Sequence, residues 1–460
     1  MTFFLIAYFA TWIFIPWILL AGKRPEATLA WIWAILLFPF LGPFAYLLFG
    51  VDRVTRSRRR TRKPAQQRDG TPHEPLPSPI HAPIFRALAR LSEIPICTAR
   101  DVRILANATD FYPALEQRIR AARHHIHIEF FIWADDEYGR KFRDLLTEVA
   151  QRGVEVRLLL DKMGSKNTEH EFFEPLRKAG GRFAWFRSIN PLRRRFSLHL
   201  RNHRKIQVID GEIAFVGGMN IGKEYMGENP DLGHWRDLQV EVAGHIVTEL
   251  QHVFAEDWNY AAEENLEGST YFPTSSEPDT DPAQVILGGP DLPAEPMAES
   301  MIALLHHARE RAWITTGYFA PDARLHSALR LAAARGVDVR LINTEKSDHP
   351  YLAHIAQSYY DELLSVGVRI FEYRPGIYHG KAFLVDDLMM IGSANCDDRS
   401  MRLNFELNIL IESVQGAEAL ANILSQDLAA SKEVDFEAFK KRPLKRKLLE
   451  ALLRPIGPMT

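Results

Sequence analysis

Cysteine is scarce in this chain of 460 residues, which contains only Cys97 and Cys396. Two thiols so far apart in the sequence argue against a disulfide framework and fit a reducing compartment. The Cys and His spacings of a zinc site are also missing, so we expect neither a metal ion nor another cofactor. A chain of this length predicts two to three domains, each able to bury its own core.

Net positive charge is lacking over most of the chain, whose formal net charge is -2. Residues 1–63 contain nine Lys or Arg against Glu26 and Asp52, a net charge of +7, which leaves -9 for residues 64–460. Proteins that coat nucleic acids present a strongly basic face. We therefore expect no nucleic-acid partner.

Charge is missing altogether from two N-terminal runs, residues 3–21 and 27–49. At ~1.5 Å per helical residue, each run would reach ~30 Å, the thickness of a bilayer's hydrocarbon core. A cleaved signal peptide is the alternative, but no positive charge precedes the first run and a second run follows at once. We expect a transmembrane hairpin over residues 1–50.

Residues 51–83 follow this hairpin and form a predicted tether. Arginines are dense between Arg53 and Lys63, and six prolines lie in residues 64–83. The positive-inside rule places such a run, and the body behind it, on the cytoplasmic side of the inner membrane. The run is either a simple topology anchor or a contact for anionic lipid, and the two roles are compatible. A proline-rich polar stretch is extended and has no core.

Strand and helix patterns alternate twice along the body. We expect helices over 114–123 and 299–310, and strands over 126–133, 152–159, 181–186, 313–319, 335–342 and 367–373. Short apolar strands alternating with helices are typical of an α/β sheet with helices on its faces. The strings from Arg152 and Arg335 both read Arg-Gly-Val-acid-Val-Arg-Leu, which indicates domain duplication. We place the domains at 84–262 and 283–435, joined by a linker over 263–282.

The C-terminal segment, residues 436–460, combines clustered Lys and Arg with pairs of leucines. This pattern favours a basic amphipathic helix lying on a bilayer, and an ordinary surface helix is the alternative. The loop at Arg193-Arg194-Arg195 is similarly open to two interpretations, as a contact for anionic headgroups or as a solvated loop.

The pattern His-x-Lys-x-x-x-x-Asp occurs twice, and each copy is followed by a small-residue turn that ends in asparagine. The first copy comprises His203, Lys205, Asp210 and Asn220, and the second comprises His379, Lys381, Asp386 and Asn395. Two matched copies predict two half-sites that face each other in one catalytic centre. Their histidines, lysines and asparagines provide donors and positive charge suited to a phosphate group.

Strand geometry predicts which residues of this motif point to the same face. Residues two apart share a face of a strand, so each His and Lys should project together. Asp210 and Asp386 lie seven positions after their histidines, an odd number. They should point the other way or sit in the turn at the strand end, bonding backbone amides. A direct catalytic role for these aspartates is the alternative.

A nucleophilic histidine needs a hydrogen bond that fixes its tautomer. Asp237 follows the first motif and Glu406 follows the second. We expect Asp237 to orient His203 and Glu406 to orient His379. Both acids could instead be surface or salt-bridge residues.

At these motifs the chain resembles the phospholipase D superfamily and, within it, the bacterial cardiolipin synthases. The resemblance extends over nearly the whole chain, and rests on the two motifs, Trp235-Arg236-Asp237 and the strings over 24–50, 201–206, 346–349, 358–360, 398–400 and 404–408. Three residues depart from the family pattern. They are Gly317 in place of a frequent proline, Gly380 in place of the usual alanine, and Cys396 after the second motif's asparagine.

This resemblance implies two tandem phospholipase D-like domains that share one active site. It also implies two-step phosphatidyl transfer, in which His203 attacks phosphatidylglycerol and His379 serves as general acid and base, although the sequence does not settle that order. The lysines and asparagines would hold the phosphate oxygens, and an anionic bilayer would be the partner. The alternatives are a hydrolase that releases phosphatidic acid, a nuclease, or a scaffold without activity.

Overall fold

The structure is a computed structural model that describes residue 8 and residues 12–21, 25–50, 75–186, 200–229, 233–273, 277–292, 294–347 and 350–459. Most of the expected tether, the Arg193–Arg195 loop, and Asp348 and His349 lie outside these residues. The chain divides into two compact units. One comprises Met1–Arg60 and Arg187–His199, and the other comprises Thr61–Phe186 and Leu200–Thr460.

The described part of the first unit contains short helices. They are α2 (Phe14–Leu20), α3 (Pro25–Leu37), α4 (Leu41–Ala45) and the π-helix η1 (Tyr46–Gly50). The expected pair of transmembrane helices is not supported, since no helix within the described residues is long and apolar enough to span a bilayer. Helix α3 has 13 residues, or roughly 20 Å at the helical rise. It ends just before Phe38-Pro39, because the residue preceding a proline disfavours the helical conformation.

The second unit is built on one 15-stranded sheet whose strand order displays the duplication. The first half contributes β1 (Cys97–Ala106), β2 (His125–Phe130), β3 (Glu155–Leu160), β4 (Arg182–Trp185), β5 (Ile206–Ile209), β6 (Ile213–Gly217) and β8 (Leu238–Ala243). The second half contributes β9 (Asp281–Gly288), β10 (Arg311–Thr315), β12 (Asp338–Thr344), β13 (Arg369–Tyr373), β15 (Ala382–Val385), β16 (Leu388–Gly392), β18 (Glu406–Glu412) and β19 (Ser431–Glu433).

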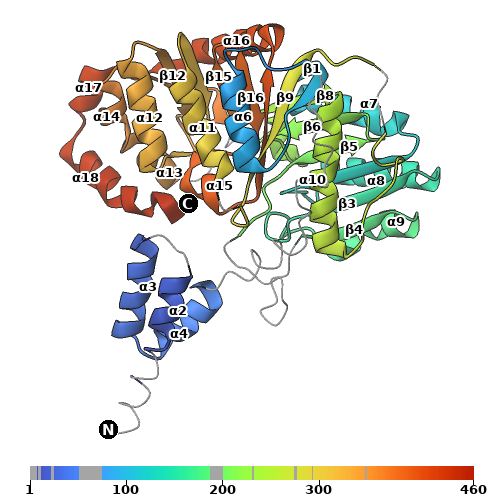
Figure 1. Cartoon of the computed structure of the whole chain (residues 1–460), viewed down its shortest axis with the longest axis horizontal. Coiled ribbons are helices and arrows are strands. Elements are labelled where there is room, and N and C mark those ends of the chain that lie inside the picture. Colours follow the sequence, from blue (N-terminus) through green and yellow to red (C-terminus); the bar gives the residue numbers. More distant parts are fainter. Residues whose placement is uncertain are drawn as a thin grey trace. The chain divides into compact units, whose positions relative to one another are not determined.

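The order β1-β8-β6-β5-β2-β3-β4 is repeated as β9-β18-β16-β15-β10-β12-β13. Figure 1 labels strands of both halves on either side of the join between β9 and β1. The two halves join where β1 and β9 pair antiparallel, with Cys97 opposite Ala283. Within each half, three strands run parallel and the remainder antiparallel. The expected α/β fold with duplicated domains is confirmed, and both halves share a continuous sheet.

Helices cover the strands of both halves. They are α6 (Ala82–Ser92), α7 (Ala108–Ala121), α8 (Glu137–Gln151), α9 (Glu174–Lys178), α10 (His245–Ala262), α11 (Pro296–His307), α12 (Ala323–Ala334), α13 (Pro350–Gln357), α14 (Tyr360–Leu364), α15 (Asp398–Arg402), α16 (Val414–Ala429), α17 (Phe436–Lys440) and α18 (Leu444–Leu453). Short 3-10 helices also occur, η3 (His170–Phe173), η4 (Lys223–Met226) and η5 (Arg454–Met459).

The repeated Arg-Gly-Val strings are helix-to-strand turns. Gly153 follows α8 with φ 94° and Gly336 follows α12 with φ 91°, a conformation that costs glycine little. In each turn the valine amide bonds back to the last helical turn, Val154 to Val149 and Val337 to Ala332. These bonds satisfy carbonyls that a helix end leaves without partners, and they aim the chain into β3 or β12.

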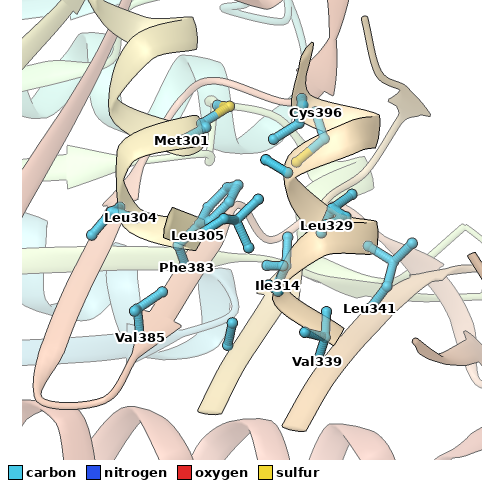
Figure 2. Packing of buried hydrophobic residues seen from close by; sticks show 14 of the residues in the cluster. Met301, Leu304, Leu305, Ile314, Leu329, Val339, Leu341, Phe383, Val385 and Cys396 are labelled. Atoms are coloured by element: carbon cyan, nitrogen blue, oxygen red, sulfur yellow. The ribbon is translucent and has the colours of Figure 1, made fainter. Parts of the chain in front are cut away.

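The core of the second half lies between its sheet and α11 and α12 (Figure 2). Alternate residues of β15 pack on opposite sides, since Phe383 and Val385 join this cluster while Ala382 and Leu384 join the cluster that includes α16. A fully buried side chain of this size stabilises the fold by roughly 1.5–3 kcal/mol. Strand β15, which directly follows His379 and Lys381, is therefore packed on both of its faces.

Candidate active site

Both motifs lie in extended segments that lead directly into a strand. Lys205 is the residue before β5, and Lys381 is the residue before β15. The histidines and lysines were expected within these strands, but hydrogen-bonded pairing begins one residue later, at Ile206 and Ala382. In each copy the lysine Nζ donates to the carbonyl oxygen of its own histidine, at 2.6 Å for Lys205. This contact ties the ammonium group to the backbone of the motif.

Backbone pairing inserts a segment of each half into the other half's motif. The short strands β7 (His234–Arg236) and β14 (Gly376–Tyr378) pair in parallel, and Asn202 forms an isolated bridge with Phe405. As a result, the His379 amide donates to the Arg236 carbonyl at 2.7 Å and the His203 amide donates to the Phe405 carbonyl at 2.8 Å. The residue after each accepting carbonyl is an acid, Asp237 or Glu406.

The histidine–carboxylate pairs are therefore crossed between the halves. His203 Nδ1 lies 2.9 Å from Glu406 Oε2, and His379 Nδ1 lies 2.6 Å from Asp237 Oδ2. The expectation that Asp237 orients His203 and Glu406 orients His379 is wrong. It assumed that a histidine takes its acid from its own half, whereas the parallel pairing of β7 with β14 carries Asp237 across.

Burial sets the electrostatics of the two imidazoles. Burial lowers the pKa of His203 to about 4, and Lys205 and Lys381 act in the same direction against the opposing charge of Glu406. The pKa of His379 is lowered, first by burial and then by Lys381 and Lys205, while Asp237 opposes the shift. Each lysine thus acts on both histidines, so the half-sites converge on one centre. At pH 7 His203 is neutral, with the proton on Nδ1 toward the carboxylate and Nε2 available to a substrate.

The carboxylates are charged despite complete burial. The pKa of Glu406 is lowered because His203, Lys205 and Ser393 outweigh the loss of solvation. Lys381 and His379 likewise lower the pKa of Asp237. Burial lowers the pKa of Lys205 to about 7, although the charge of Glu406 opposes this shift. Lys205 therefore changes its protonation state close to neutral pH.

Aromatic rings surround the histidines. The Phe131 ring lies edge-on to His203 with centroids 4.8 Å apart, and Tyr318 lies edge-on to His379 at 6.0 Å. Gly317 is also close, since a Cβ there would lie 3.0 Å from His379 Cδ2. The absence of a side chain at this position lets the loop after β10 approach the second histidine.

The two motif asparagines are used differently. Asn220 Oδ1 accepts from the Ile132 amide at 3.0 Å, and its Nδ2 donates to the Tyr225 hydroxyl at 3.2 Å. Asn220 thus braces the loop after β2. Asn395 is buried, and its Oδ1 has no hydrogen-bond partner among the described residues. Of the two side-chain amides, Asn395 is the one with unused hydrogen-bonding capacity beside His379.

The motif aspartates sit in the turns at the strand ends, one of the two positions expected for them. Asp210 has φ 56° and accepts hydrogen bonds from the amides of Arg123, His124 and His125. Asp386 has φ 51° and accepts from the amides of Arg309, Glu310 and Arg311. Both aspartates fasten the turn that precedes a parallel strand, at the opposite end of β5 or β15 from the lysine.

Comparison with known proteins identifies this arrangement. Residues 115–258 and 301–428 match the family model described as "Cardiolipin synthase, PLD-like domain", and residues 6–50 match that described as "Phospholipase_D-nuclease N-terminal". The chain is 35% identical to a cardiolipin synthase of Geobacillus thermodenitrificans, over 97% of this chain and 92% of that protein. It is 36% identical to cardiolipin synthase 2 of Bacillus cereus, over 96% of this chain and 88% of that protein.

The chain belongs to the phospholipase D-like cardiolipin synthase family. This membership makes it a phosphatidyltransferase of the phospholipase D superfamily, as the two motifs indicated. A phosphatidylserine synthase of Haemophilus influenzae has the same fold, with a TM-score of 0.61 and 16% identity, over 81% of this chain and 97% of that structure.

Ser393 contacts the site of this cardiolipin synthase-like chain, and sequence reasoning did not single it out. Its hydroxyl donates to Glu406 Oε2 at 2.5 Å, the same oxygen that pairs with His203. The corresponding position in the first motif's turn is Gly218, where a Cβ would lie 2.2 Å from Asp237 Oδ1. The difference between Gly-Gly-Met-Asn and Gly-Ser-Ala-Asn was the signal in the sequence.

Arg204, between the first His and Lys, is a second residue that the sequence did not reveal as important. It is 1% exposed and forms a 2.6 Å ion pair with Asp257 of α10. Its guanidinium also donates to the carbonyls of Glu406 and Gly288 in the other half. The second motif has Gly380 at this position. Arg204 therefore joins the first motif both to its own helix layer and to the second domain.

Proposed function

We propose that this chain makes cardiolipin and glycerol from two molecules of phosphatidylglycerol through a phosphatidyl-histidine intermediate. The crossed pairs, His203 with Glu406 and His379 with Asp237, carry this proposal. Two imidazoles, each fixed by a buried carboxylate, supply one nucleophile and one proton carrier at the same centre. Two lysines supply positive charge where a phosphodiester would bind.

In the first step, His203 Nε2 attacks the phosphorus of the first phosphatidylglycerol. The phosphorus–oxygen bond to the glycerol headgroup breaks, and His379, protonated on Nε2, gives its proton to the departing glycerol oxygen. Glu406 stabilises the positive charge that develops on His203. The ammonium groups of Lys205 and Lys381 and the Nδ2 group of Asn395 are the candidates for donating to the non-bridging oxygens.

In the second step, His379, now neutral, takes the proton from the terminal hydroxyl of a second phosphatidylglycerol. That oxygen attacks the phosphorus, and the bond to His203 Nε2 breaks. Two phosphatidylglycerols thus yield one cardiolipin and one glycerol, and His379 has regained its proton. The balance needs no additional reactant and no cofactor.

The assignment of His203 as nucleophile rests on Ser393. Its hydroxyl donates to the same Glu406 oxygen that pairs with His203, which leaves less negative charge for His203. Asp237 Oδ2 pairs with His379 at 2.6 Å while Oδ1 accepts from the Leu238 amide. Asp237 therefore stabilises a protonated His379 more than Glu406 stabilises a protonated His203. This difference suits His379 to carry the proton. The less basic His203 is the better leaving group from phosphorus.

The same proposal places the enzyme at the cytoplasmic face of the inner membrane. In the N-terminal unit, Ile13 is 76% exposed, Leu20 86% and Leu41 69%, and Trp33 is also exposed. Exposed apolar side chains at this density mark a surface that contacts lipid or protein. The arginine-rich run after this unit favours the cytoplasmic side. An acidic body supports a lipid substrate over a nucleic acid.

The decisive test incubates the purified protein with phosphatidylglycerol and resolves the products. We expect cardiolipin and free glycerol in equal amounts. Phosphatidic acid without cardiolipin would mean that water is the acceptor, and would contradict the transferase proposal. A His203→Ala or His379→Ala variant that kept full activity would contradict the site assignment.

A further inference from the structure

The C-terminal helix α18 is attached to the body by its polar face. Arg442, just before the helix, is bridged by 2.7 Å ion pairs to Asp361 of α14 and to Glu450. Glu450 is 1% exposed. At the end of the helix, Arg454 pairs with Glu362 at 2.9 Å. Amphipathic helices of globular proteins normally turn their apolar face inward. Here Leu453 packs against the core, but the buried Glu450 and its ion pairs form most of the described contact with the body.

The other leucines of α18 are exposed. Leu444 is 70% exposed, Leu448 61% and Leu452 72%, at the four-residue spacing that forms one stripe along a helix. Leu449 and Ile456 are also exposed and widen the stripe. We call these five residues the leucine edge. Elsewhere in the described part of the catalytic unit, exposed large apolar side chains are scattered singly or in pairs, at Leu76, Ile80, Leu331, Tyr351 and Val414.

Positive charge borders the leucine edge. Lys440, Lys441, Lys445 and Arg446 are exposed around the start of α18. The acid of this helix, Glu450, is buried on the opposite face. An apolar stripe with basic residues beside it fits the boundary between anionic headgroups and acyl chains. A protein partner with an acidic surface would complement the lysines, but it would not require the continuous stripe of exposed leucines.

The leucine edge is connected to the second half-site. Beyond α18, Gly457 lies against Ile355, Ala320 and Tyr359, with its Cβ position 3.5 Å from the Ala320 side chain. Ala320 belongs to β11 (Phe319–Ala320), which pairs with β17 (Cys396–Asp397). These two strands directly follow Tyr318 and Asn395, the residues beside His379. The segment that carries the edge therefore packs on the layer that forms this side of the site.

We propose that the leucine edge docks on an anionic bilayer and holds the His379 side of the active site toward the membrane. This inference rests on the proposed lipid substrate for its choice of partner. The lipid that reaches His379 would then enter from the leaflet on which α18 lies.

The test places a fluorophore on the edge of the full-length protein through Leu448→Cys. The native Cys97 and Cys396 are buried, which raises the pKa of both thiols and protects them from labelling. The matched control is Leu331→Cys on α12, whose side chain is 49% exposed. Each protein is reconstituted into phosphatidylcholine vesicles with and without phosphatidylglycerol. Lipids that carry a spin-label quencher on the acyl chain report contact with the bilayer.

We expect quenching at position 448 that is strongest with phosphatidylglycerol, and little quenching at position 331. Equal quenching at the two positions, or none at 448, would overturn the proposal. A fluorescence change at 448 that grows with protein concentration in the absence of quencher would show that a second copy covers the edge, and would also overturn it. This readout does not depend on turnover, so it separates the docking proposal from the proposed reaction.

A variant measures the consequence for catalysis. Leu444→Gln, Leu448→Gln and Leu452→Gln together should lower the rate on vesicles about tenfold, because three exposed leucines leave the interface. The rate on phosphatidylglycerol in detergent micelles should remain unchanged, as should that of Leu331→Gln on vesicles. An unchanged vesicle rate for the triple variant would contradict a role for the edge in orienting the site.

Discussion

The two half-sites have the same groups but different neighbours. Each contains a histidine and a lysine at the same spacing and a carboxylate from the other half. In one, Ser393 shares the carboxylate with the histidine, whereas the other has Gly218 at that position. Asn220 is engaged by the fold, whereas Asn395 keeps an unused oxygen. Duplication thus supplies matched reactive groups, and their neighbours make the two halves unequal.

The strongest test of this inequality replaces one histidine at a time. His203→Asn and His379→Asn should each lower kcat by about 100,000-fold, since nucleophile and proton carrier work as a unit. Phosphatidylglycerol labelled with ³²P should still leave a trace of covalent label on the His379→Asn protein, because His203 remains. The His203→Asn protein should carry none. Label on the His203→Asn protein alone would reverse the assignment of the nucleophile.

The crossed pairing has its own test in double-mutant cycles. Asp237→Asn and Glu406→Gln should each lower kcat by about 1,000-fold or more, because each leaves a histidine without its carboxylate. Asp237→Asn should add little loss to His379→Asn, since the two residues act as a pair. The control is Asp237→Asn on top of His203→Asn, where a separate loss is expected if residual activity is measurable. The opposite pattern of coupling would restore pairing within each half.

Much of this architecture could be predicted from the sequence because the motif repeats. Strand periodicity located β3 and β12 and the third strands β4 and β13 to within three residues at each end. Helix α7 begins at Ala108, six residues before its expected start, and Pro113 lies inside it. A proline inside a helix removes a hydrogen bond and normally favours a start after it, which the pattern at 114 suggested. Local patterns were sufficient wherever the structure depends on neighbours along the chain.

The carboxylate pairing could not be predicted in the same way. Asp237 meets His379 through the parallel pairing of two three-residue strands, each too short to be recognised from its pattern. The expected transmembrane helices are not supported within the described residues for a different reason. Hydropathy over residues 27–49 is continuous, yet the helix stops before Phe38-Pro39. Long-range pairing and local backbone restriction are both invisible to a count of apolar residues.

The pH dependence of kcat/KM should separate the requirement for a neutral His203 from the requirement for a charged Lys205. In the free enzyme His203 must be neutral, so kcat/KM should fall as pH drops through about 4, the pKa of His203. As pH rises, kcat/KM should fall in two stages, because His379 must be protonated to release glycerol and Lys205 must be protonated to attract a phosphodiester. His379, whose pKa is lowered, loses its proton first, and Lys205 follows at about 7. We therefore expect a bell-shaped profile.

Lys205→Arg is the matched control for the upper limb of that profile. The guanidinium stays charged, so the stage of the decline that Lys205 causes near pH 7 should disappear or move to higher pH, while the stage due to His379 remains and the absolute rate falls. The lower limb should not change. If the decline of kcat/KM near pH 7 stays at the same pH in Lys205→Arg, another group causes that decline.

The smallest expected effect comes from Ser393, the residue that makes the half-sites unequal. Ser393→Ala removes a hydrogen bond to the charged Glu406 carboxylate, and this loss should lower kcat about tenfold. Because Glu406 then has more negative charge for His203, the lower limb of the kcat/KM profile should move to higher pH. Ser393→Thr, which keeps a hydroxyl, is the control and should keep the limb near that of the native protein. A lower kcat without any shift of the lower limb would mean that Ser393 only supports the local fold, and that the two halves owe their inequality to other neighbours such as Arg204.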